Sequence, residues 1–300
     1  MAGTKASGHF SLELPEKPNY EHIEVHPKTL ALGAEIRGVD LSKVTSNKIY
    51  SEIADALWRY HVIFFEDQDL TSEAHLSLAR SLGKPEIHEI FKADEEFPEI
   101  SILENDETRP PEINTWHTDT TFRDRPSACS ILYCQISNDG GDTMWLNQNL
   151  AFNQLSLPIK VMLLDMEAEH DILNYYSGTK MLEGAGGEEK AKKLRESHPI
   201  VRHPVIVKHP RSDLPCLMVN PTHTKRLVGV QKLESDRLLS LLYEHLQSPE
   251  FSVRYKWNPG SVAIWDNLAT QHYALADYFP QRRKMRRITV EGEHILPYQE

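Results

Sequence analysis

The sequence predicts one mainly β domain, in which early helices flank a barrel made of two sheets. Two observations support this fold class. Helical periodicity is concentrated before residue 84, whereas short β-like runs between turn residues dominate the chain after it. In addition, 300 residues with 40% hydrophobic content are ample for one sizeable core, and no internal repeat or low-complexity tract divides the chain.

The first third of the chain predicts strands and two helices. Residues 23–40 hold short apolar runs separated by glycines, which predict strands and a turn. Residues 48–60 place apolar side chains at helical spacing, and the apolar run 62–65 predicts a buried strand. A second helix is expected to begin with Ser72 as its cap and to end at Gly83.

The rest of the chain is rich in predicted strands, with two helical interruptions at about 158–166 and 234–247. The segment 173–197 is long, highly charged and contains glycine, which predicts a lid or a partly ordered insertion. Residues 1–20 lack periodicity and predict a flexible tail, so that the domain spans 21–300. The predicted strands are 130–136, 143–146, 204–208, 216–219, 261–265 and 286–290.

Composition excludes several classes of protein. A net charge of -11 argues against nucleic acid as a partner, because a duplex binder needs a basic surface. No apolar run approaches the roughly 18 residues of a membrane helix, and the N-terminus does not resemble a signal peptide. Cys129, Cys134 and Cys216 form no close-set metal pairs and predict reduced thiols, hence a cytoplasmic protein.

A candidate metal site combines His117 and Asp119 with His272, about 150 residues later. On a strand, residues two apart point to the same face, so the first two could reach one ion. Two imidazoles and one carboxylate with open positions are the ligands of non-haem Fe(II) oxygenases. By spacing alone this signal is weak, because the chain holds 15 histidines and Asp119 could simply accept a backbone hydrogen bond. Rival ligands are His88, His198, His203, His209 and His223.

A basic run at 281–287 contains four arginines and a lysine. One interpretation is a solvated basic face or a phosphate-binding patch. Strand alternation favours another, since it would place Arg283 and Arg287 together on one face. Two arginines inside a barrel need anions to neutralise them, which predicts two separate anionic ligands.

Several segments follow one another along the chain in a familiar order. They are GAEIRGVDL (33–41), HVIFFEDQ (61–68), LGKPEIH (82–88), WHTDTTF (116–122), GGDTMW (140–145), SVAIWDNLATQHYALADY (261–278) and PQRRKMRR (280–287). Together they resemble the taurine dioxygenase family of Fe(II)- and 2-oxoglutarate-dependent oxygenases. The resemblance covers roughly residues 23–295 and implies a double-stranded β-helix core of the jelly-roll, cupin-like type. It implies His117, Asp119 and His272 as the catalytic iron triad, with 2-oxoglutarate and O2 as co-substrates.

The resemblance also implies roles for residues that would hold the two anions. Thr143 would contact the 2-oxoglutarate carboxylate near the metal, and Arg283 would pair with the distal carboxylate. Arg287, His88 and the backbone amide of Thr120 would receive the sulfonate of the substrate.

Two positions depart from the taurine-specific pattern. Phe91 stands at an aromatic pocket position but lacks a phenol hydroxyl, and Ile113 stands where those members carry a polar amide. An isoleucine cannot hydrogen-bond the amine of taurine. We therefore expect a longer or less polar sulfonate, or an alkyl sulfate ester, as the preferred substrate.

The predicted reaction hydroxylates the carbon next to a sulfonate or sulfate ester. It releases sulfite or sulfate and an aldehyde, with succinate and CO2, a reaction of sulfur metabolism. The presence of Asp119 favours hydroxylation, because related halogenases leave that ligand position to chloride. Two alternatives stay open: another small anion such as a carboxylate as substrate, or a Zn-dependent hydrolase using the same triad. The family resemblance further implies a homo-oligomer, either a dimer or a tetramer.

Overall fold

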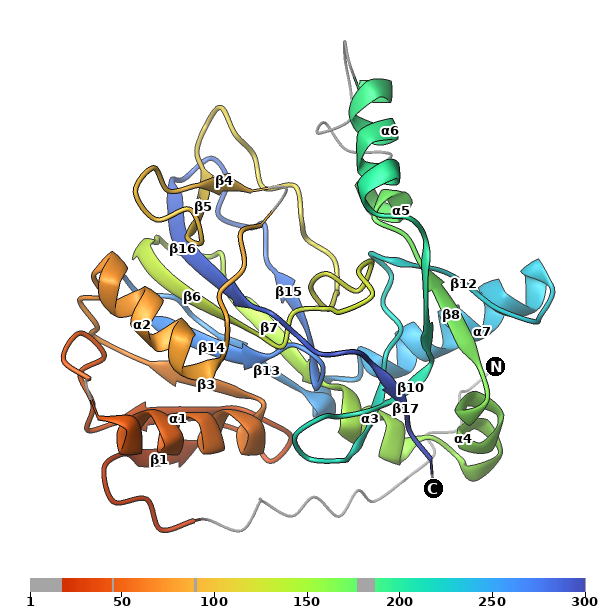
Figure 1. Ribbon diagram of the computed structural model, residues 1–300, viewed down its shortest axis with the longest axis horizontal. Helices are drawn as coiled ribbons and strands as arrows, with labels where there is room; N and C mark the ends of the chain where they lie inside the picture. Colours follow the sequence, from red (N-terminus) through yellow and green to blue (C-terminus); the bar gives the residue numbers. More distant parts are fainter. Residues whose placement is uncertain (1–17, 45, 89–90, 177–186, 300) are drawn as a thin grey trace.

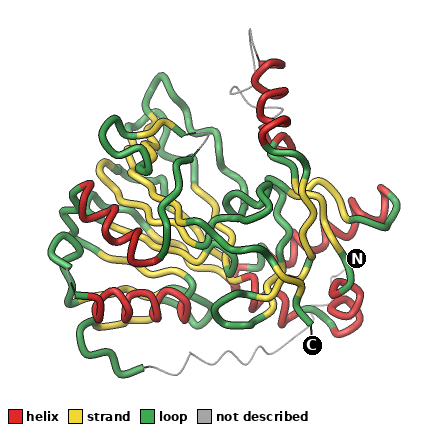
Figure 2. The backbone as a smooth tube through the Cα atoms, viewed as in Figure 1, coloured by secondary structure: helices red, strands yellow, loops and turns green. Residues whose placement is uncertain are grey.

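The computed structural model describes residues 18–44, 46–88, 91–176 and 187–299. The predicted tail lies outside these residues except for its last three positions, and the middle of the 173–197 segment also lies outside them. Figure 2 shows a strand-rich interior with most helices on the outside. No helix of the described part is long and apolar enough to cross a membrane.

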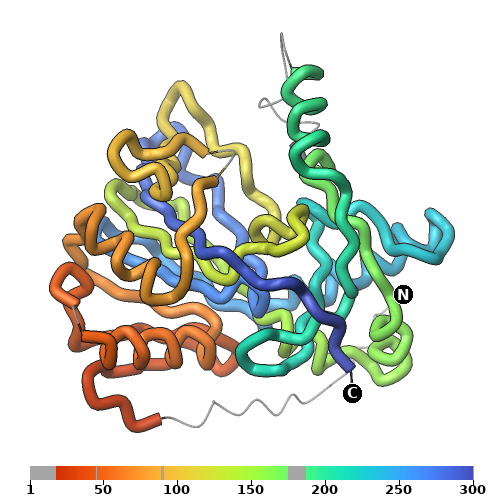
Figure 3. The backbone as a smooth tube through the Cα atoms, in the orientation of Figure 1, coloured from red at the N-terminus to blue at the C-terminus, as the bar shows by residue number. Residues whose placement is uncertain are grey.

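One sheet of eight strands is the largest in the described part of the chain (Figure 1). Its pairs are antiparallel except for β2 and β3, which run parallel. Segments far apart in sequence meet here: Figure 3 shows β16, near the end of the chain, beside β6 from its middle. In spatial order the strands are β1 (Glu24–Pro27), β2 (Ala34–Arg37), β3 (Val62–Phe65), β14 (Val262–Asp266), β6 (Cys129–Ile136), β16 (Arg283–Val290), β5 (Ser101–Asn105) and β4 (Lys92–Ala93).

Three smaller sheets of three strands each complete the β structure. The first contains β13 (Ser252–Tyr255), β7 (Thr143–Asn147) and β15 (Thr270–Ala274). The second contains β12 (Thr224–Leu227), β8 (Glu167–His170) and β9 (Val201–Pro204). The third contains β11 (Pro215–Leu217), β10 (Ile206–Lys208) and β17 (Leu296–Pro297).

Two cores share the large sheet, one on each face. In β3, Val62 and Phe64 pack into the core that also holds β7 and β13, while Ile63 and Phe65 pack into the core beneath the helices. The same alternation recurs in β6 and β14. Because neighbouring side chains of a strand point to opposite faces, a strand covered on both sides must be apolar throughout.

Helices α1 (Asn47–Tyr60) and α2 (Ser72–Leu82) cover the second of these cores, as Figure 1 shows. Glycine at 83 ends α2, as predicted, but the predicted cap is wrong by one residue. Thr71 is the N-cap, and its side chain accepts a hydrogen bond from the amide of Ala74. Ser72 instead accepts a hydrogen bond from Arg286.

The remaining helices lie among the smaller sheets, except α6, which projects away from the body (Figure 1). The two helical interruptions predicted from sequence are confirmed as α4 and α7. The described ends of the 173–197 segment are helical, as α5 and α6. These helices are α3 (Gln148–Gln154), α4 (Leu157–Leu164), α5 (Leu173–Tyr176), α6 (Gly187–Ser197) and α7 (Lys232–Leu246), followed by the 3-10 turn η1 (Pro249–Phe251).

Most predicted strands are confirmed with shifts of one or two residues, but two expectations need correction. The run 204–208 is not one strand: β9 ends at Pro204 and β10 begins at Ile206, in a different sheet. Val205 between them bonds to Met166 instead. The strand predicted at 286–290 is longer than expected, because β16 begins at Arg283 and so includes both arginines of the predicted anion sites.

Candidate active site

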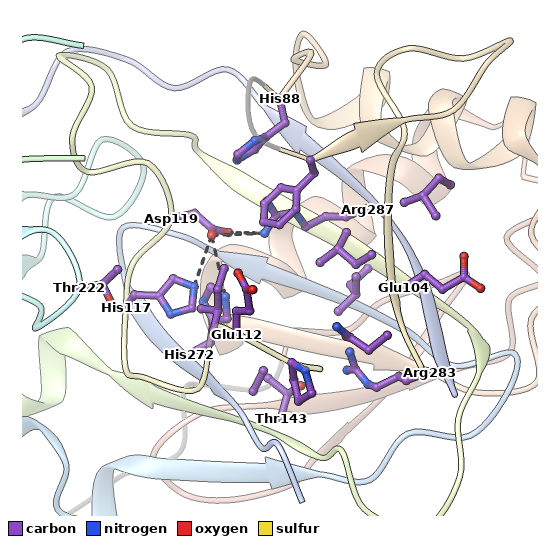
Figure 4. Close-up of a pocket in the computed structure, with 18 of the residues that line it drawn as sticks. His88, Glu104, Glu112, His117, Asp119, Thr143, Thr222, His272, Arg283 and Arg287 are labelled. Atoms are coloured by element: carbon purple, nitrogen blue, oxygen red, sulfur yellow. Dashed lines mark hydrogen bonds and ion pairs between the residues drawn. The ribbon is translucent and has the colours of Figure 1, made fainter. Parts of the chain in front are cut away.

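Three buried side chains with metal-binding atoms meet in one cavity. His117, Asp119 and His272 each offer one ligand atom, and these atoms all lie within 4.8 Å of one another. Figure 4 shows both imidazoles directed at the carboxylate. His117 Nε2 lies 3.7 Å and His272 Nε2 lies 3.9 Å from Asp119 Oδ1. This donor set and spacing fit a divalent metal ion, and no other such group occurs in the described part of the chain.

A single β-bridge joins the two histidine ligands. The backbone N–H of His117 donates to the carbonyl of His272 over 3.0 Å, and the reverse bond measures 2.8 Å. The regular strand expected around His117 and Asp119 is wrong, since the segment pairs only at this bridge and a turn follows it. Thr120 within that turn has a φ of 57°. The ligands converge because β15 holds His272 against this irregular segment.

The protonation states of the three side chains suit a metal. Burial lowers the pKa of His117 and holds the pKa of His272 well below its usual range, so both rings are neutral near pH 7. Burial alone would raise the pKa of Asp119, but the Arg287 guanidinium and the nearby imidazoles hold it well below its usual range. His117 Nδ1 lies 2.8 Å from the carbonyl of Thr115, which leaves Nε2 as the unprotonated atom.

One end of the cavity is built around Arg283 (Figure 4). Its Nε has no hydrogen-bond partner, and no carboxylate of the described residues lies within ion-pair distance. Burial lowers the pKa of this guanidinium. Beside it, Thr143 Oγ1 accepts a hydrogen bond of 2.9 Å from Trp257 Nε1, so the hydroxyl proton is free to be donated elsewhere. A buried cation without a counterion predicts an anionic ligand at this end.

Arg287 supplies the second cation, next to the candidate metal ligands. Its Nη1 lies 3.3 Å from Asp119 Oδ1, while Nε and Nη2 have no partner among the described residues. The guanidinium carbon lies 4.7 Å from the ring centroid of Phe91. His88 packs against the same ring, with centroids 4.6 Å apart, and burial lowers its pKa to about 3. The amide of Thr120 makes no hydrogen bond within the described part of the chain.

All ten residues predicted from sequence line one cavity of about 450 Å³. This volume is within the usual range for small-molecule sites. Apolar side chains form much of the remaining wall, among them Ile102, Leu103, Phe122 and Leu132. The ten residues are His88, Phe91, Ile113, His117, Asp119, Thr120, Thr143, His272, Arg283 and Arg287.

The rival histidines have other surroundings. His203 bonds the carbonyls of Thr121 and Arg123, and His209 pairs with Asp266 at 2.8 Å. His198 packs edge-on against Phe122, with ring centroids 5.2 Å apart. His223 lines the cavity, but it does not belong to the cluster of donor atoms.

Sequence reasoning missed several residues of the site. Glu112 lines the cavity near its mouth, and Trp257 orients the Thr143 hydroxyl. Ser130 Oγ donates to Asp119 Oδ2 over 3.1 Å, and Asn267 bonds the backbone of Asp119. Such contacts depend on tertiary packing, so only the polar pair Asp266-Asn267 after an apolar strand gave any signal, and it indicated no more than a turn.

Known proteins resemble this chain over nearly its whole length. The family described as taurine catabolism dioxygenase TauD, TfdA family matches residues 24–289. An alpha-ketoglutarate-dependent sulfate ester dioxygenase from Pseudomonas putida is 34% identical, over 93% of each protein. An alkylsulfatase from Acinetobacter baylyi is 35% identical, over 91% of this chain and 86% of the relative. The solved structure of a taurine dioxygenase from Burkholderia xenovorans has 33% identity and a TM-score of 0.78, with 92% of both chains covered.

Proposed function

Because the chain belongs to the taurine catabolism dioxygenase TauD, TfdA family, we propose that it is an Fe(II)- and 2-oxoglutarate-dependent dioxygenase. Its reaction would hydroxylate the carbon next to a sulfonate or sulfate ester, releasing sulfite or sulfate and an aldehyde. Succinate and CO2 would come from 2-oxoglutarate, which is alpha-ketoglutarate under another name. The observation that carries this proposal is the convergence of His117, Asp119 and His272 in a cavity with two arginines.

In this proposal the triad holds iron on one face and leaves positions open for ligands. When bound, iron would activate O2 with 2-oxoglutarate as the source of electrons. Arg283 would hold the distal carboxylate of 2-oxoglutarate, for which a planar guanidinium offers two parallel hydrogen bonds. Thr143 would donate its hydroxyl proton to the inner carboxylate, and its contact with Trp257 supports this direction.

The substrate anion would bind on the other side of the triad. Arg287 offers two unpartnered nitrogens there, and the Thr120 amide offers a backbone donor. His88, kept neutral by burial, would donate one further hydrogen bond. Because Arg283 and Arg287 both line the cavity but have different neighbours, two different acids can be held at once.

The wall of the cavity supports an apolar chain on the substrate. Phe91, Ile113 and Phe122 line it, so part of the wall beyond the anion offers hydrocarbon to the carbon chain, beside polar lining residues such as Asn105 and Glu112. The similarity to a sulfate ester dioxygenase and to an alkylsulfatase favours an alkyl sulfate ester or a longer sulfonate over taurine. A turnover screen in which taurine surpasses every alkyl sulfonate and alkyl sulfate would refute this preference.

Four broader proposals accompany this function. The sheets and the two cores support a double-stranded β-helix core within one domain at 21–300. A lid function of 173–197 stays a prediction, as does assembly into a dimer or tetramer. Three buried free thiols support the cytoplasmic location predicted from sequence.

A panel of organosulfur compounds tests the function. Purified protein with Fe(II), O2 and 2-oxoglutarate should form succinate and sulfite or sulfate in equal amounts with an accepted substrate. His117→Ala should abolish both products. Formation of succinate only when a carboxylate is the substrate would indicate the alternative, a dioxygenase of small carboxylates. Release of sulfate with Zn²⁺ but without succinate would indicate a hydrolase.

A further inference from the structure

The irregular segment that carries two of the candidate ligands is fixed, residue by residue, to the segment that carries the third. His117 forms the backbone bridge with His272. Thr118 donates its hydroxyl to the carbonyl of Thr270 over 2.9 Å. Asp119 is bonded through its backbone to the side chain of Asn267.

Asn267 makes the most extensive of these contacts. Its Oδ1 accepts from the amide of Asp119 and its Nδ2 donates to the carbonyl of Asp119, each over 2.9 Å. The same Nδ2 donates to the carbonyl of Ser127 over 2.8 Å. The side chain is fully buried. It therefore pairs with Asp119 as a neighbouring strand would, at a point where no strand is present.

Thr120, within this turn, has a strained backbone conformation and an amide that makes no hydrogen bond in the described part of the chain. Thr120 follows Asp119 with a φ of 57°, a conformation that costs energy for a residue other than glycine. Its hydroxyl accepts from the amide of Ser127 over 2.8 Å, so both ends of the 119–127 turn are tied together. Asn267 closes the same turn through its bonds to Asp119 and Ser127.

We propose that Asn267 is a positioning residue that sets the Asp119 carboxylate at the distance a metal ion needs from both histidines. It acts through backbone bonds and does not touch metal or substrate. Ser130 holds the outer oxygen Oδ2, which leaves Oδ1 facing the two imidazoles. This inference rests on the proposed function only in taking Asp119 as a metal ligand.

Binding of Mn²⁺ alone, followed by electron paramagnetic resonance of the free ion, tests the proposal without turnover. Asn267→Ala should weaken Mn²⁺ binding about 10- to 100-fold, the usual cost of losing a group that orients a metal ligand. Asn147→Ala is the matched control. Asn147 is also a buried amide that joins two segments, through Ala31 and Leu150, but it contacts no candidate ligand. That variant should lose thermal stability and keep the Mn²⁺ affinity of the wild type.

The Mn²⁺ affinities of the wild type and the variants test the positioning role and the proposed function separately. Equal Mn²⁺ affinity for wild type and Asn267→Ala would overturn the positioning role, as would equal weakening in both alanine variants. Absence of binding to the wild type, or undiminished binding to His117→Ala, would overturn the proposed function itself. If Asn267→Ala does not fold, Asn267→Ser enters the same titration, because its hydroxyl can replace one lost bond but not the paired geometry.

Discussion

Arg283 and Arg287 lie four residues apart on β16, yet their side chains have different neighbours in the cavity. The large sheet's register with β6 shifts by one residue between Lys284 and Met285, whereas the pairing with β5 stays regular. Both arginines therefore keep the same face and enter the cavity, while Arg286 turns to Ser72 and Asp94 on the other. Figure 4 shows Arg283 beside Thr143 and Arg287 beside Asp119.

Separate substitution of these arginines should divide the two anion sites. Arg283→Ala should raise the KM for 2-oxoglutarate about 10- to 100-fold, because charged paired hydrogen bonds contribute roughly 1.5 to 3 kcal/mol. Arg287→Ala should weaken substrate binding, while slow succinate formation without substrate continues. Initial rates with each component varied in turn provide the measurement, and Arg283→Lys, which keeps charge without the planar fork, serves as the control. The opposite division would exchange the two roles.

The cysteines should be inert in the native protein. Burial raises the pKa of all three thiols, so the reactive thiolate is scarce near pH 7, and none is accessible to a reagent. A colorimetric thiol reagent should label none of them within minutes in buffer and all three in guanidinium chloride. Rapid labelling of the native protein would show that a thiol reaches solvent. Cys129, Cys134 and Cys216 are the three residues.

At this scale the sequence predicted the residues that line the cavity better than those that support them. His117, Asp119 and His272 were identifiable through the family resemblance, because their spacing alone was a weak signal among 15 histidines. Asn267 and Trp257 were not identifiable, since no sequence pattern distinguishes them from any other asparagine in a turn or tryptophan in a core. Their roles follow from partners far away in sequence, such as Asp119 and Thr143.

Among the elements, the turn before β7 shows how a loop shapes the site. Gly140 and Gly141 both have positive φ, at 87° and 72°. A Cβ at Gly141 would lie 2.9 Å from Tyr278 Cδ1 and 3.2 Å from Arg283 Cδ. Two adjacent glycines indicate a turn in any sequence, but only the structure gives the reason for this one, which is the close approach of the Arg283 side chain.

Gly141→Ala should therefore weaken 2-oxoglutarate binding as well as stability. Gly229→Ala is a suitable control, because Gly229 also has positive φ, at 81°, with nothing within 4 Å of the added Cβ. Both variants should lose about 1 kcal/mol through backbone strain. Only Gly141→Ala should also displace Arg283 and raise the KM for 2-oxoglutarate. Thermal melts and initial rates supply both readings, and an equal effect on KM in the two variants would contradict the steric argument.

Elements with strong periodicity were predictable, and elements defined by their neighbours were not. Helix α1 and strand β3 were clear because both cover or span a core. Strand β15 was missed, although it carries His272, because its sequence alternates weakly and its pairing with β7 supplies the order. The break at Val205 was also invisible, since it reflects a change of sheet rather than a turn residue.

For the molecule as a whole, acid should weaken the part of the large sheet that contains β2. Glu35 on β2 lies between Arg37 and Lys28, and these cations lower its pKa to about 2. A lowered pKa in the folded state gives stability that is present above the unfolded pKa of roughly 4.3 and is lost as pH falls towards 2.

Glu35→Gln tests this dependence. The variant should be less stable than wild type by about 2 kcal/mol at pH 7, the contribution of charged hydrogen bonds, and the difference should shrink as pH falls below about 4. Urea denaturation at pH 7, 5 and 3 provides the free energies of unfolding. Glu96→Gln, at an exposed glutamate, should show no such trend. A difference that grows on acidification would contradict the assigned sign.

The strand-rich character of the chain could be predicted because burial on both faces of a strand leaves a clear apolar signature. The strand order β1-β2-β3-β14-β6-β16-β5-β4 could not, since it joins segments from opposite ends of the sequence. Local pattern determines which residues form a strand, whereas only packing determines which strand lies beside it.

The bridge between His117 and His272 has a consequence for biosynthesis. The ribosome synthesises the first two candidate donors long before the third. The residues that hold the 117–119 segment in place, Asn267 and His272, are translated equally late. A nascent chain therefore presents at most an incomplete set of donors while it is being translated. Iron loading must then follow translation of β15, so the cell's supply of ferrous ion meets a chain that is already nearly complete.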